Sequence, residues 1–286
     1  MAASTAALRG ITKQYKDFTL GPVDMTVPAG SIVGLIGENG AGKTTLLKIL
    51  CGVNRADDGT IDLLGGSPAD AATRAKIGVV FEDAFFYGSF TAAQVGRSMA
   101  GVYGARWSDE AFAAYLRRFE LDAGKKLKEY SRGMRLKLSL AAALAHDPEL
   151  LVLDEATAGL DPVVRGELMD LFLEFIQDER HSIVMSSHIT ADLEQVADSI
   201  AYLHNGQLLF HENKDELLQS YGVLHCGEDV LTSLPADLVI FTKHGAFGCE
   251  TLVKDRAAVR ELLPDAVCDA AGLDDIMRFY SGRDAQ

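Results

Sequence analysis

Residues 37 to 44 read Gly37-Glu38-Asn39-Gly40-Ala41-Gly42-Lys43-Thr44, and this stretch decides the fold of the chain. It follows a short apolar run, Ser31 to Ile36, and leads into a helical pattern, Thr44 to Leu50. The pattern GxxxxGK[ST] between a strand and a helix is typical of a loop that binds nucleotide phosphates. Glycines let successive backbone N–H groups converge on phosphate oxygens, and the helix N-terminus adds positive potential. The stretch therefore predicts a phosphate-binding loop in an α/β protein.

The side chains of this loop predict contacts with different parts of a nucleotide. We expect Lys43 to neutralise the β- and γ-phosphates, Thr44 to ligate Mg²⁺ and Thr45 to contact the α-phosphate. The rest of the predicted binding surface is the backbone of Gly37, Glu38, Asn39, Gly40, Ala41 and Gly42. A glycine-rich turn without a ligand is the alternative interpretation. Taken alone, the loop predicts nucleotide binding and nothing narrower.

A second apolar run carries two carboxylates at its end. Leu150-Leu151-Val152-Leu153 is the pattern of a buried strand, and Asp154 and Glu155 follow it directly. Open α/β sheets bind their ligands at the carboxyl ends of the strands. We therefore expect Asp154 to hold Mg²⁺ and Glu155 to polarise the water that attacks the γ-phosphate. The alternative is a helix cap, because acids after a strand often begin the next turn.

Composition limits the classes of protein to consider. The 286 residues are 48% hydrophobic and 24% charged, with a formal net charge of −14. This acidic balance argues against nucleic acid as a partner, because such binding depends on clustered Lys and Arg. The sequence lacks both a run of about 18 apolar residues and a secretory signal, so we expect a cytoplasmic location.

The four cysteines predict neither a metal site nor a disulfide. Cys51, Cys226, Cys249 and Cys268 are far apart in the sequence and form no CxxC or Cys/His spacing. In a cytosolic protein such cysteines are expected to remain reduced.

The order of patterns along the chain predicts its organisation. Apolar runs alternate with helical patterns, which favours a mainly parallel sheet. Strand signals disappear between Phe90 and Ala145, where three helical stretches follow, one of them capped by Ser108. Asn205-Gly206 lies between two apolar runs and predicts a type I′ hairpin. From about Tyr221 a small α+β appendage is expected, whose role the sequence leaves open.

Further motifs accompany the loop and the Asp-Glu pair. Tyr130-Ser131-Arg132-Gly133-Met134 opens the helix that precedes the Asp-Glu strand, and Ala158-Gly159-Leu160-Asp161 follows that strand. His188 stands at the end of a later strand. In this order and spacing, the motifs from about Ala7 to Tyr221 resemble those of the ATP-binding subunits of ABC transporters.

The resemblance implies roles for residues whose patterns alone are ambiguous. Tyr15 is at the position of the aromatic residue that stacks on adenine, although by itself it is equally a packing tyrosine. Ser131 and Gly133 match the family's LSGGQ signature, whereas Arg132 and Met134 depart from it. In the family this signature contacts the γ-phosphate of ATP bound to the opposite subunit. Without the resemblance, Ser131 is an N-cap of the following helix.

Three other positions are also assigned through the resemblance. Asp161 matches the acid of a loop that crosses the dimer interface, and His188 matches the switch histidine that contacts the γ-phosphate. By itself Asp161 is part of a turn before a helix. Glu82 occupies the place of the family's glutamine, which contacts Mg²⁺ or its water. Glutamate only accepts hydrogen bonds, so amide donation is lost there. Alternatively, Glu82 is a surface acid and Asp83 or a shifted register supplies the position.

The resemblance also implies an architecture. It is a P-loop NTPase fold with an N-terminal antiparallel β subdomain and a helical subdomain inserted at about residues 83–147. We expect the ABC nucleotide-binding domain to span residues 1–220 and an accessory region to span residues 221–286.

The altered signature, Glu82 and the short appendage look most like bacterial drug, lantibiotic or bacitracin-type exporters. The implied function is hydrolysis of ATP with Mg²⁺, which powers export of a drug, peptide or lipid-like compound. The implied partners are a separate membrane permease and a second nucleotide-binding subunit, at the cytoplasmic face of the membrane. The permease is expected to dock near Glu82 to Phe90. Two alternatives are an ATP-sensing regulatory module and a soluble ABC ATPase without a transport role.

Overall fold

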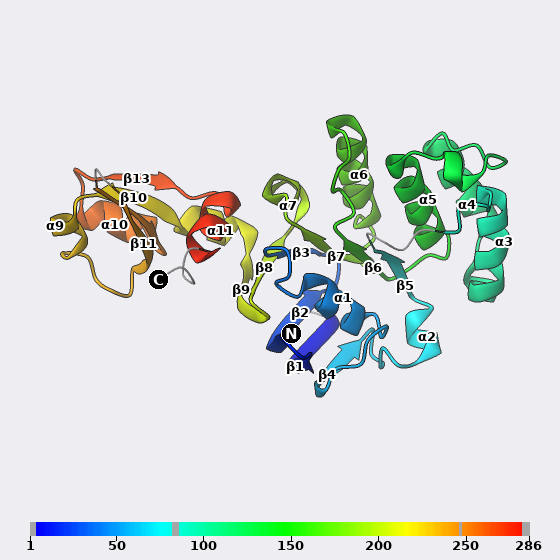
Figure 1. Ribbon diagram of the computed structural model, residues 1–286, viewed down its shortest axis with the longest axis horizontal. Coiled ribbons are helices and arrows are strands. Elements are labelled where there is room, and N and C mark those ends of the chain that lie inside the picture. The colour runs from blue at the N-terminus through cyan, green and yellow to red at the C-terminus, as the bar shows by residue number, and fades with distance from the viewer. Residues whose placement is uncertain (1–3, 82–85, 246–247, 282–286) are drawn as a thin grey trace. The chain divides into compact units, whose positions relative to one another are not determined.

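The computed structural model describes residues 4–81, 86–245 and 248–281. The chain forms two compact units, labelled by element in Figure 1. The first comprises residues 1–197 and 201–210, and the second comprises residues 198–200 and 211–286. The expected division into a nucleotide-binding domain of residues 1–220 and an accessory region of residues 221–286 stays a prediction.

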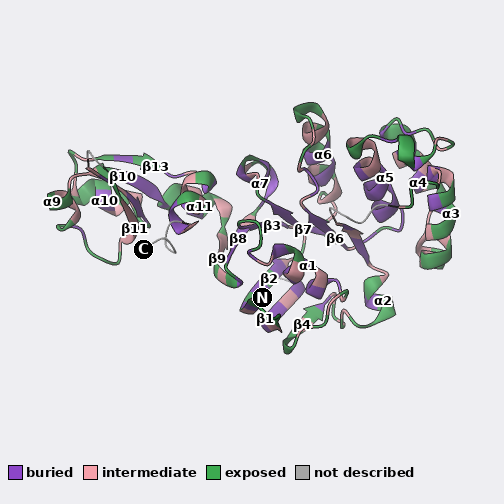
Figure 2. Cartoon of the chain, in the orientation of Figure 1, coloured by how far each residue is buried: buried purple, intermediate pink, exposed green. Residues whose placement is uncertain are grey.

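A six-stranded sheet forms the centre of the first unit. Its order is β5-β6-β7-β3-β8-β9, and the pairs β5–β6, β6–β7 and β7–β3 are parallel. Every residue of β3, β6 and β7 is buried, as Figure 2 shows, because a parallel sheet is covered on both faces. The expected α/β fold with a mainly parallel sheet is confirmed. The strands are β3 (Ile32–Ile36), β5 (Ile77–Val80), β6 (Leu150–Asp154), β7 (Ser182–Ser187), β8 (Ser199–His204) and β9 (Gln207–Asn213).

A smaller antiparallel sheet lies N-terminal to most of these strands, as expected. It has the order β2-β1-β4, and Leu8, Leu46 and Val152 illustrate a core that it shares with α1 and the central sheet. Its strands are β1 (Ser4–Gln14), β2 (Thr19–Pro28) and β4 (Asp58–Leu63). The helices that connect strands of this unit are α1 (Lys43–Leu50), α2 (Ala71–Arg74), α6 (Pro162–Phe175) and α7 (Thr190–Val196).

Between β5 and β6 the chain forms the expected helical subdomain. Ser108 Oγ accepts a hydrogen bond from Ala111 N at 3.0 Å, so the predicted cap is confirmed. Thr91 and Gln94 cap the first helix by exchanging side-chain and backbone hydrogen bonds. The helices are α3 (Ala92–Tyr103), α4 (Asp109–Arg118) and α5 (Arg132–Leu144), with single 3₁₀ turns at Gly104–Arg106 and Leu127–Glu129.

His146, just after α5, makes the stability of this subdomain pH-dependent. Its ring is buried and stacks on Tyr103 with centroids 3.8 Å apart. Burial, and secondarily the charge of Arg106, lowers the pKa of His146 from 6.5 to about 4. Between these values the unfolded chain binds a proton that the folded chain does not. Stability from this group is therefore complete above about pH 6.5 and falls as the pH drops toward 4.

We expect the folded state to lose about 2 kcal/mol through His146 between pH 7 and pH 4.5. His146→Phe keeps an aromatic ring against Tyr103 but removes the titrating group. Thermal unfolding of both proteins at the two pH values measures the effect, because all other titrations are common to them. The midpoint of the variant should fall less than that of the parent chain. An equal fall in both proteins would contradict this account.

The hairpin between β8 and β9 is confirmed. Asn205 has a φ of 46° and Gly206 a φ of 80°, and a type I′ turn requires both values to be positive.

The second unit is the predicted α+β appendage. Its antiparallel sheet has the order β11-β12-β10-β13, and Leu224, Val253 and Val259 pack in its core. The strands are β10 (Gly222–Cys226), β11 (Val239–Gly245), β12 (Gly248–Val253) and β13 (Val267–Ala270). The helices are α8 (Lys214–Ser220), α9 (Glu228–Leu231), α10 (Arg256–Leu262) and α11 (Leu273–Ser281). Across both units, every helix of the described residues is too short or too polar to span a bilayer.

Candidate active site

Three parallel strands end side by side and gather the predicted motifs. The glycine loop follows β3, the two acids end and follow β6, and His188 follows β7. In the sheet register, Ile36 pairs with Ser187 and Asp154 pairs with Ser186. Since β7 lies between β3 and β6, its carboxyl end joins the loop to the acids.

Close packing explains why glycine is needed at two positions of the loop. Gly42 has a φ of 108°, and a Cβ atom there would lie 2.9 Å from the Phe18 ring. A Cβ atom at Gly37 would clash with the carbonyl oxygen of Leu203. The loop backbone is also tied to the β8–β9 turn, because Gly206 N donates to the Ala41 carbonyl at 3.0 Å. The backbone of Leu203 and Gly206 thus fixes the position of the loop.

The start of α1 suits an anion. The helix begins at Lys43, and its N-cap, Gly42, has no side chain to accept hydrogen bonds from the first-turn N–H groups. The first turn contains no acidic residue, and Thr44 in that turn is exposed. Glu38, Asn39 and Gly40 are exposed as well. This helix end therefore offers N–H donors and positive potential to a phosphate.

Asp154 lies between two hydroxyl groups. Thr44 Oγ1 donates to Asp154 Oδ2 at 2.7 Å, and Ser186 Oγ donates to Asp154 Oδ1 at 2.7 Å. Asp154 is buried, whereas Thr44 is exposed. A carboxylate and a hydroxyl at this distance form the hard oxygen donor set that Mg²⁺ prefers, so the residues present fit that ion.

Glu155 links the loop to His188. Its Oε1 lies 3.2 Å from Lys43 Nζ, and the two side chains are only 10% and 6% exposed. His188 Nδ1 lies 2.6 Å from Glu155 Oε2, and His188 N also donates to that oxygen at 3.3 Å. Because a carboxylate only accepts, the short contact implies that Nδ1 carries a hydrogen. Lys43 Nζ further donates to the Gly37 carbonyl at 2.7 Å and to the Glu38 carbonyl at 3.3 Å.

The backbone of Glu155 is unusual. Its φ is 51°, in the left-handed region that residues other than glycine rarely adopt. Its N–H donates to Ser186 Oγ at 3.0 Å, which holds the turn against β7. Ser186 thus contacts both acids. Strain of this kind is often found where a functional side chain is held in one direction.

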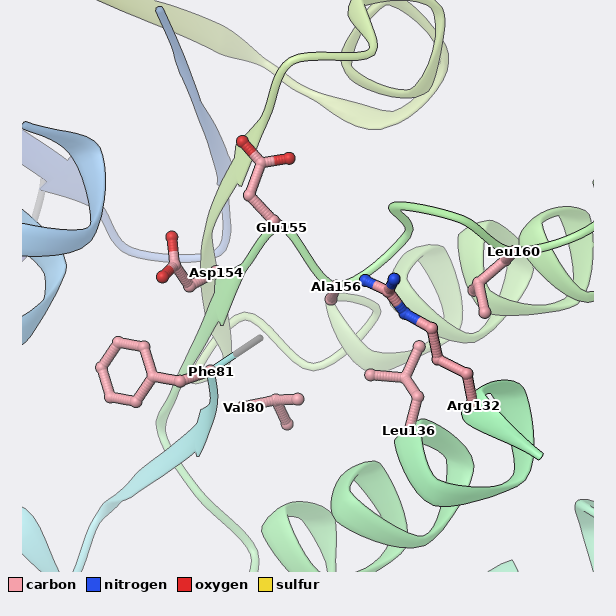
Figure 3. A pocket seen from close by; sticks show the side chains of 8 residues that line it. All are labelled: Val80, Phe81, Arg132, Leu136, Asp154, Glu155, Ala156 and Leu160. Atoms are coloured by element: carbon pink, nitrogen blue, oxygen red, sulfur yellow. The ribbon is translucent and has the colours of Figure 1, made fainter. Parts of the chain in front are cut away.

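A small pocket beside the two acids extends toward α5 (Figure 3). Val80, Phe81, Arg132, Leu136, Ala156 and Leu160 line it together with Asp154 and Glu155. In Figure 3 the guanidinium of Arg132 points toward the segment after Ala156. A Cβ atom at Gly159 would lie 3.2 Å from Arg132 Nη1. Arg132 is therefore packed against the loop of its own chain.

The signature serine and the predicted interface acid both form local helix caps. Ser131 Oγ accepts from Met134 N at 3.2 Å and caps α5, and Asp161 Oδ1 accepts from Val163 N and Val164 N at 3.1 Å and caps α6. A Cβ atom at Gly133 would meet only ordinary contacts, with Leu160 Cδ2 at 3.7 Å. Ser131 and Asp161 are exposed, so their surfaces remain accessible to another molecule.

Tyr15 is connected to the glycine loop through the ring of Phe18. Its side chain is exposed, and its ring centroid is 6.4 Å from that of Phe18, which packs against Gly42. Phe18 and Ser186 were not predicted as site residues. The signal for Ser186 was available, since it stands in the Ser-Ser pair before His188, but its contact with Asp154 depends on strand register. Glu82 and Asp83 lie outside the described residues.

Comparison with known proteins identifies the family. A family profile described as ABC transporter matches residues 20–158. The lantibiotic transport ATP-binding protein SrtF of Streptococcus pyogenes is 34% identical over 214 residues, which are 73% of this chain and 90% of that protein. The chain belongs to the ABC transporter ATP-binding family. The family predicted from the sequence motifs is thereby confirmed.

Other relatives of this ABC ATP-binding chain agree. The bacitracin transport ATP-binding protein BcrA of Enterococcus faecalis is 34% identical over 72% of this chain and 68% of that protein. The chain spans 60% of the length of an uncharacterised ABC transporter ATP-binding protein of Synechocystis, at 37% identity. A solved ATP-binding subunit of an ABC transporter has 28% identity and a TM-score of 0.66, and the match covers 74% of this chain and 91% of that one.

Proposed function

We propose that this ABC ATPase binds ATP with Mg²⁺ and hydrolyses it to drive a separate membrane permease, with Glu155 as the general base. The observation that carries this proposal is the position of the Glu155 carboxylate, between Lys43 and His188 and beside the Thr44–Asp154 pair. Phosphoryl transfer requires positioning and charge stabilisation more than covalent chemistry. These five residues would provide both the positioning and the charge stabilisation at one edge of the sheet.

Each residue has a role that follows from its chemistry. Thr44 and Asp154 would hold Mg²⁺, which neutralises charge on the phosphates when bound. Lys43 would bind the β- and γ-phosphates, and Thr45 and the loop backbone would bind the rest of the triphosphate. His188 keeps Glu155 oriented through Nδ1, and its half-exposed ring would be available to the γ-phosphate. Tyr15 would provide an exposed aromatic face for adenine.

A water molecule can be activated only by a carboxylate that is available to accept its proton. Glu155 is instead engaged by Lys43 and His188 in this structure. Phosphate oxygens attract the Lys43 ammonium as the carboxylate does, so nucleotide binding would free Glu155 for a hydrogen bond to water. The base would thus act only after the lysine has a phosphate to bind.

The site is proposed to be completed by a second subunit. Ser131 and Gly133 open α5, and their contacts among the described residues are local, although the family pattern assigns them to a phosphate. A helix N-terminus with an exposed hydroxyl is suited to an anion from another molecule. Asp161 would contact the opposite subunit, and Arg132 would add a charge-assisted contact to its nucleotide.

Replacing Ser131 by Asp separates the capping role from the phosphate role. Aspartate is as good an N-cap as serine, so α5 should remain stable. Its negative charge would repel the γ-phosphate of the partner's ATP, and we expect turnover to fall about 10-fold or more, since one such contact is worth about 1.5–3 kcal/mol. Steady-state ATPase assays and thermal unfolding of the variant measure the two effects.

Ser108→Asp is the matched control, because Ser108 caps α4 in the same subdomain through the same kind of hydrogen bond. It should keep both stability and turnover. Normal turnover of Ser131→Asp would reject the signature role. A loss of folding stability in that variant alone would instead point to a local fault in the cap.

Transport is supported by the relatives, whose names state transport of bacitracin and of a lantibiotic. We propose an export substrate of that general class, a drug, peptide or lipid-like compound, and a position at the cytoplasmic face of the membrane. Tyr87 is 78% exposed and its ring packs on Phe90 at 5.9 Å, which provides an aromatic surface for a permease helix. Phe81 and Phe86 are half-buried nearby in sequence, and Phe85 lies outside the described residues.

The ATPase rate of the purified chain with and without its co-purifying permease tests the coupling. Stimulation by the permease that is lost on Tyr87→Ala would support transport. The alternative is an ATP-sensing module, which the departures at Arg132 and Met134 and the glutamate at position 82 would permit. Such a module would bind ATP, hydrolyse it slowly and show no response to a permease.

A further inference from the structure

Three side chains of metal-ligand type converge at one end of the C-terminal sheet. They are Glu228, His244 and Cys249, whose ligand atoms all lie within 4.8 Å of one another. His244 Nδ1 is 3.4 Å from Cys249 Sγ and 3.5 Å from Glu228 Oε1. A single imidazole nitrogen is therefore close to both a thiol and a carboxylate.

The sheet register places these groups together. Cys249 on β12 is directly opposite His244 on β11 and directly opposite Cys226 on β10. Directly opposed residues of antiparallel strands project from the same face. Glu228 begins α9, two residues after β10 ends at Cys226, and α9 packs on β12. Residues that are far apart in the sequence thus share one face and one sheet end.

We propose that Glu228, His244 and Cys249 bind a zinc ion. Thiolate, imidazole and carboxylate are the three ligand types that zinc takes in proteins. With Zn–S bonds of about 2.3 Å and Zn–N and Zn–O bonds of about 2.0–2.2 Å, a tetrahedral site separates its ligand atoms by about 3.3–3.6 Å. The distances of 3.4 and 3.5 Å from His244 Nδ1 match the edges of such a tetrahedron.

The surroundings of the cluster meet two further requirements of a metal site. Cys249 is only 4% exposed, so its sulfur is held in place, while His244 and Glu228 are exposed enough to close on an ion. Cys226, Cys249 and His244 also border an open depression of about 600 Å³, which gives an ion a route of entry. A water molecule or the neighbouring Cys226 thiol would complete four ligands.

The neighbouring histidine is a natural comparison. His225 follows Leu224 and precedes Cys226 on β10, so it projects from the opposite face of the sheet. Its ring nitrogens lie 3.9 Å from Glu250 and 3.7 Å from Asp269, with no thiol in the set. It has carboxylate neighbours like His244 but does not belong to the cluster.

A bound zinc would join α9 to the β11–β12 hairpin. An ion that binds only the folded state stabilises it, and the stabilisation grows with the logarithm of the free ion concentration once this exceeds the dissociation constant. The proposal therefore assigns the appendage a metal-dependent stability that is independent of nucleotide. It does not rest on the proposed ATPase function, and either can fail without the other.

The test uses the full chain, treated with a chelator and kept in a reductant that does not bind metal. Zinc is titrated in excess Mg²⁺, which competes for oxygen-donor sites such as Thr44 and Asp154, and binding is followed by calorimetry. Cobalt(II) is titrated in parallel, because its thiolate charge-transfer absorption reports a cysteine ligand. We expect one ion per chain, an upward shift in the unfolding temperature of the appendage and a cobalt–thiolate band.

Three variants decide the result. His244→Gln and Cys249→Ser should lose the stoichiometric ion, and Cys249→Ser should also lose the cobalt–thiolate band. His244→Gln changes an exposed side chain, 55% accessible, so the variant remains informative even if Cys249→Ser folds poorly. His225→Gln should bind zinc as the parent chain does. Undiminished binding in His244→Gln and Cys249→Ser, no binding in the parent chain, or an equal loss in His225→Gln would overturn the proposal.

Discussion

Glu155→Gln is expected to lower ATP turnover by about 10²–10⁴-fold, the contribution of a general base, while ATP binding is retained. Glutamine keeps the size and hydrogen-bonding reach of the side chain but cannot take a proton from water. It also cannot attract Lys43 as an anion does, so ATP should bind at least as tightly as in the parent chain. With two ATP molecules bound and hydrolysis blocked, the variant should accumulate as a dimer.

Single-turnover hydrolysis, equilibrium nucleotide binding and light scattering measure these three properties. Glu149→Gln is the matched control, because Glu149 immediately precedes β6 and pairs with Lys76 at the opposite end of the strand. It should behave as the parent chain does. Turnover of Glu155→Gln at the parent rate would remove Glu155 from the proposed mechanism.

Lys43→Ala is expected to raise the dissociation constant for ATP by about 10²–10⁴-fold. Hydrogen bonds to charged groups are worth about 1.5–3 kcal/mol each, and Lys43 is expected to serve two phosphates. The substitution also leaves the Glu155 carboxylate nearly buried without its cation, although His188 still contacts it. The nucleotide-free variant should therefore unfold at a lower temperature than the parent chain.

Nucleotide binding measured by calorimetry tests this expectation. Lys48→Ala provides the control within the same helix, since Lys48 lies in the last turn of α1 and its ammonium is placed over the Phe81 ring. It removes the same charge from α1 but should leave ATP affinity within about twofold. ATP affinity of Lys43→Ala equal to that of Lys48→Ala would contradict the predicted role of the loop lysine.

Much of the fold was predictable because local chemistry and tertiary structure agree. The glycine loop between a strand and a helix requires an α/β context, and the Asn205-Gly206 turn requires a hairpin. Lys43, Thr44, Asp154 and Glu155 were expected at one sheet edge because parallel strands present their carboxyl ends together. The roles of Ser131, Asp161 and Tyr15 came from resemblance, and these roles remain predictions.

The contacts that sequence reasoning missed depend on register. Ser186 reaches Asp154 because the two residues pair across β6 and β7, and a shift of one residue would have turned its hydroxyl away. Phe18 contacts Gly42 because β2 brings it beside the loop, and no spacing in the sequence encodes that distance. The left-handed φ of Glu155 is likewise set by its tertiary surroundings.

Register also explains why the cysteines did not suggest a metal site. Metal motifs are recognised by several ligands at short spacings, but among the proposed ligands only His244 and Cys249 are close in the sequence, while Glu228 and the neighbouring Cys226 lie well before them. In an antiparallel sheet, however, sequence separation says little about distance between side chains, and Cys226 and Cys249 are directly opposed. The cluster is therefore apparent only once the pairing of the strands is known, because no short sequence motif encodes that pairing.

The ion pair between Lys43 and Glu155 has a consequence for the timing of the reaction. Under the proposed mechanism, the Lys43 ammonium that would bind the phosphates of ATP also holds the carboxylate of the general base, Glu155. Before ATP binds, the charge of Lys43 is thus already paired with that of Glu155. Nucleotide binding would replace the Glu155 carboxylate by phosphate oxygens as the partner of Lys43, and only then would Glu155 become available to water.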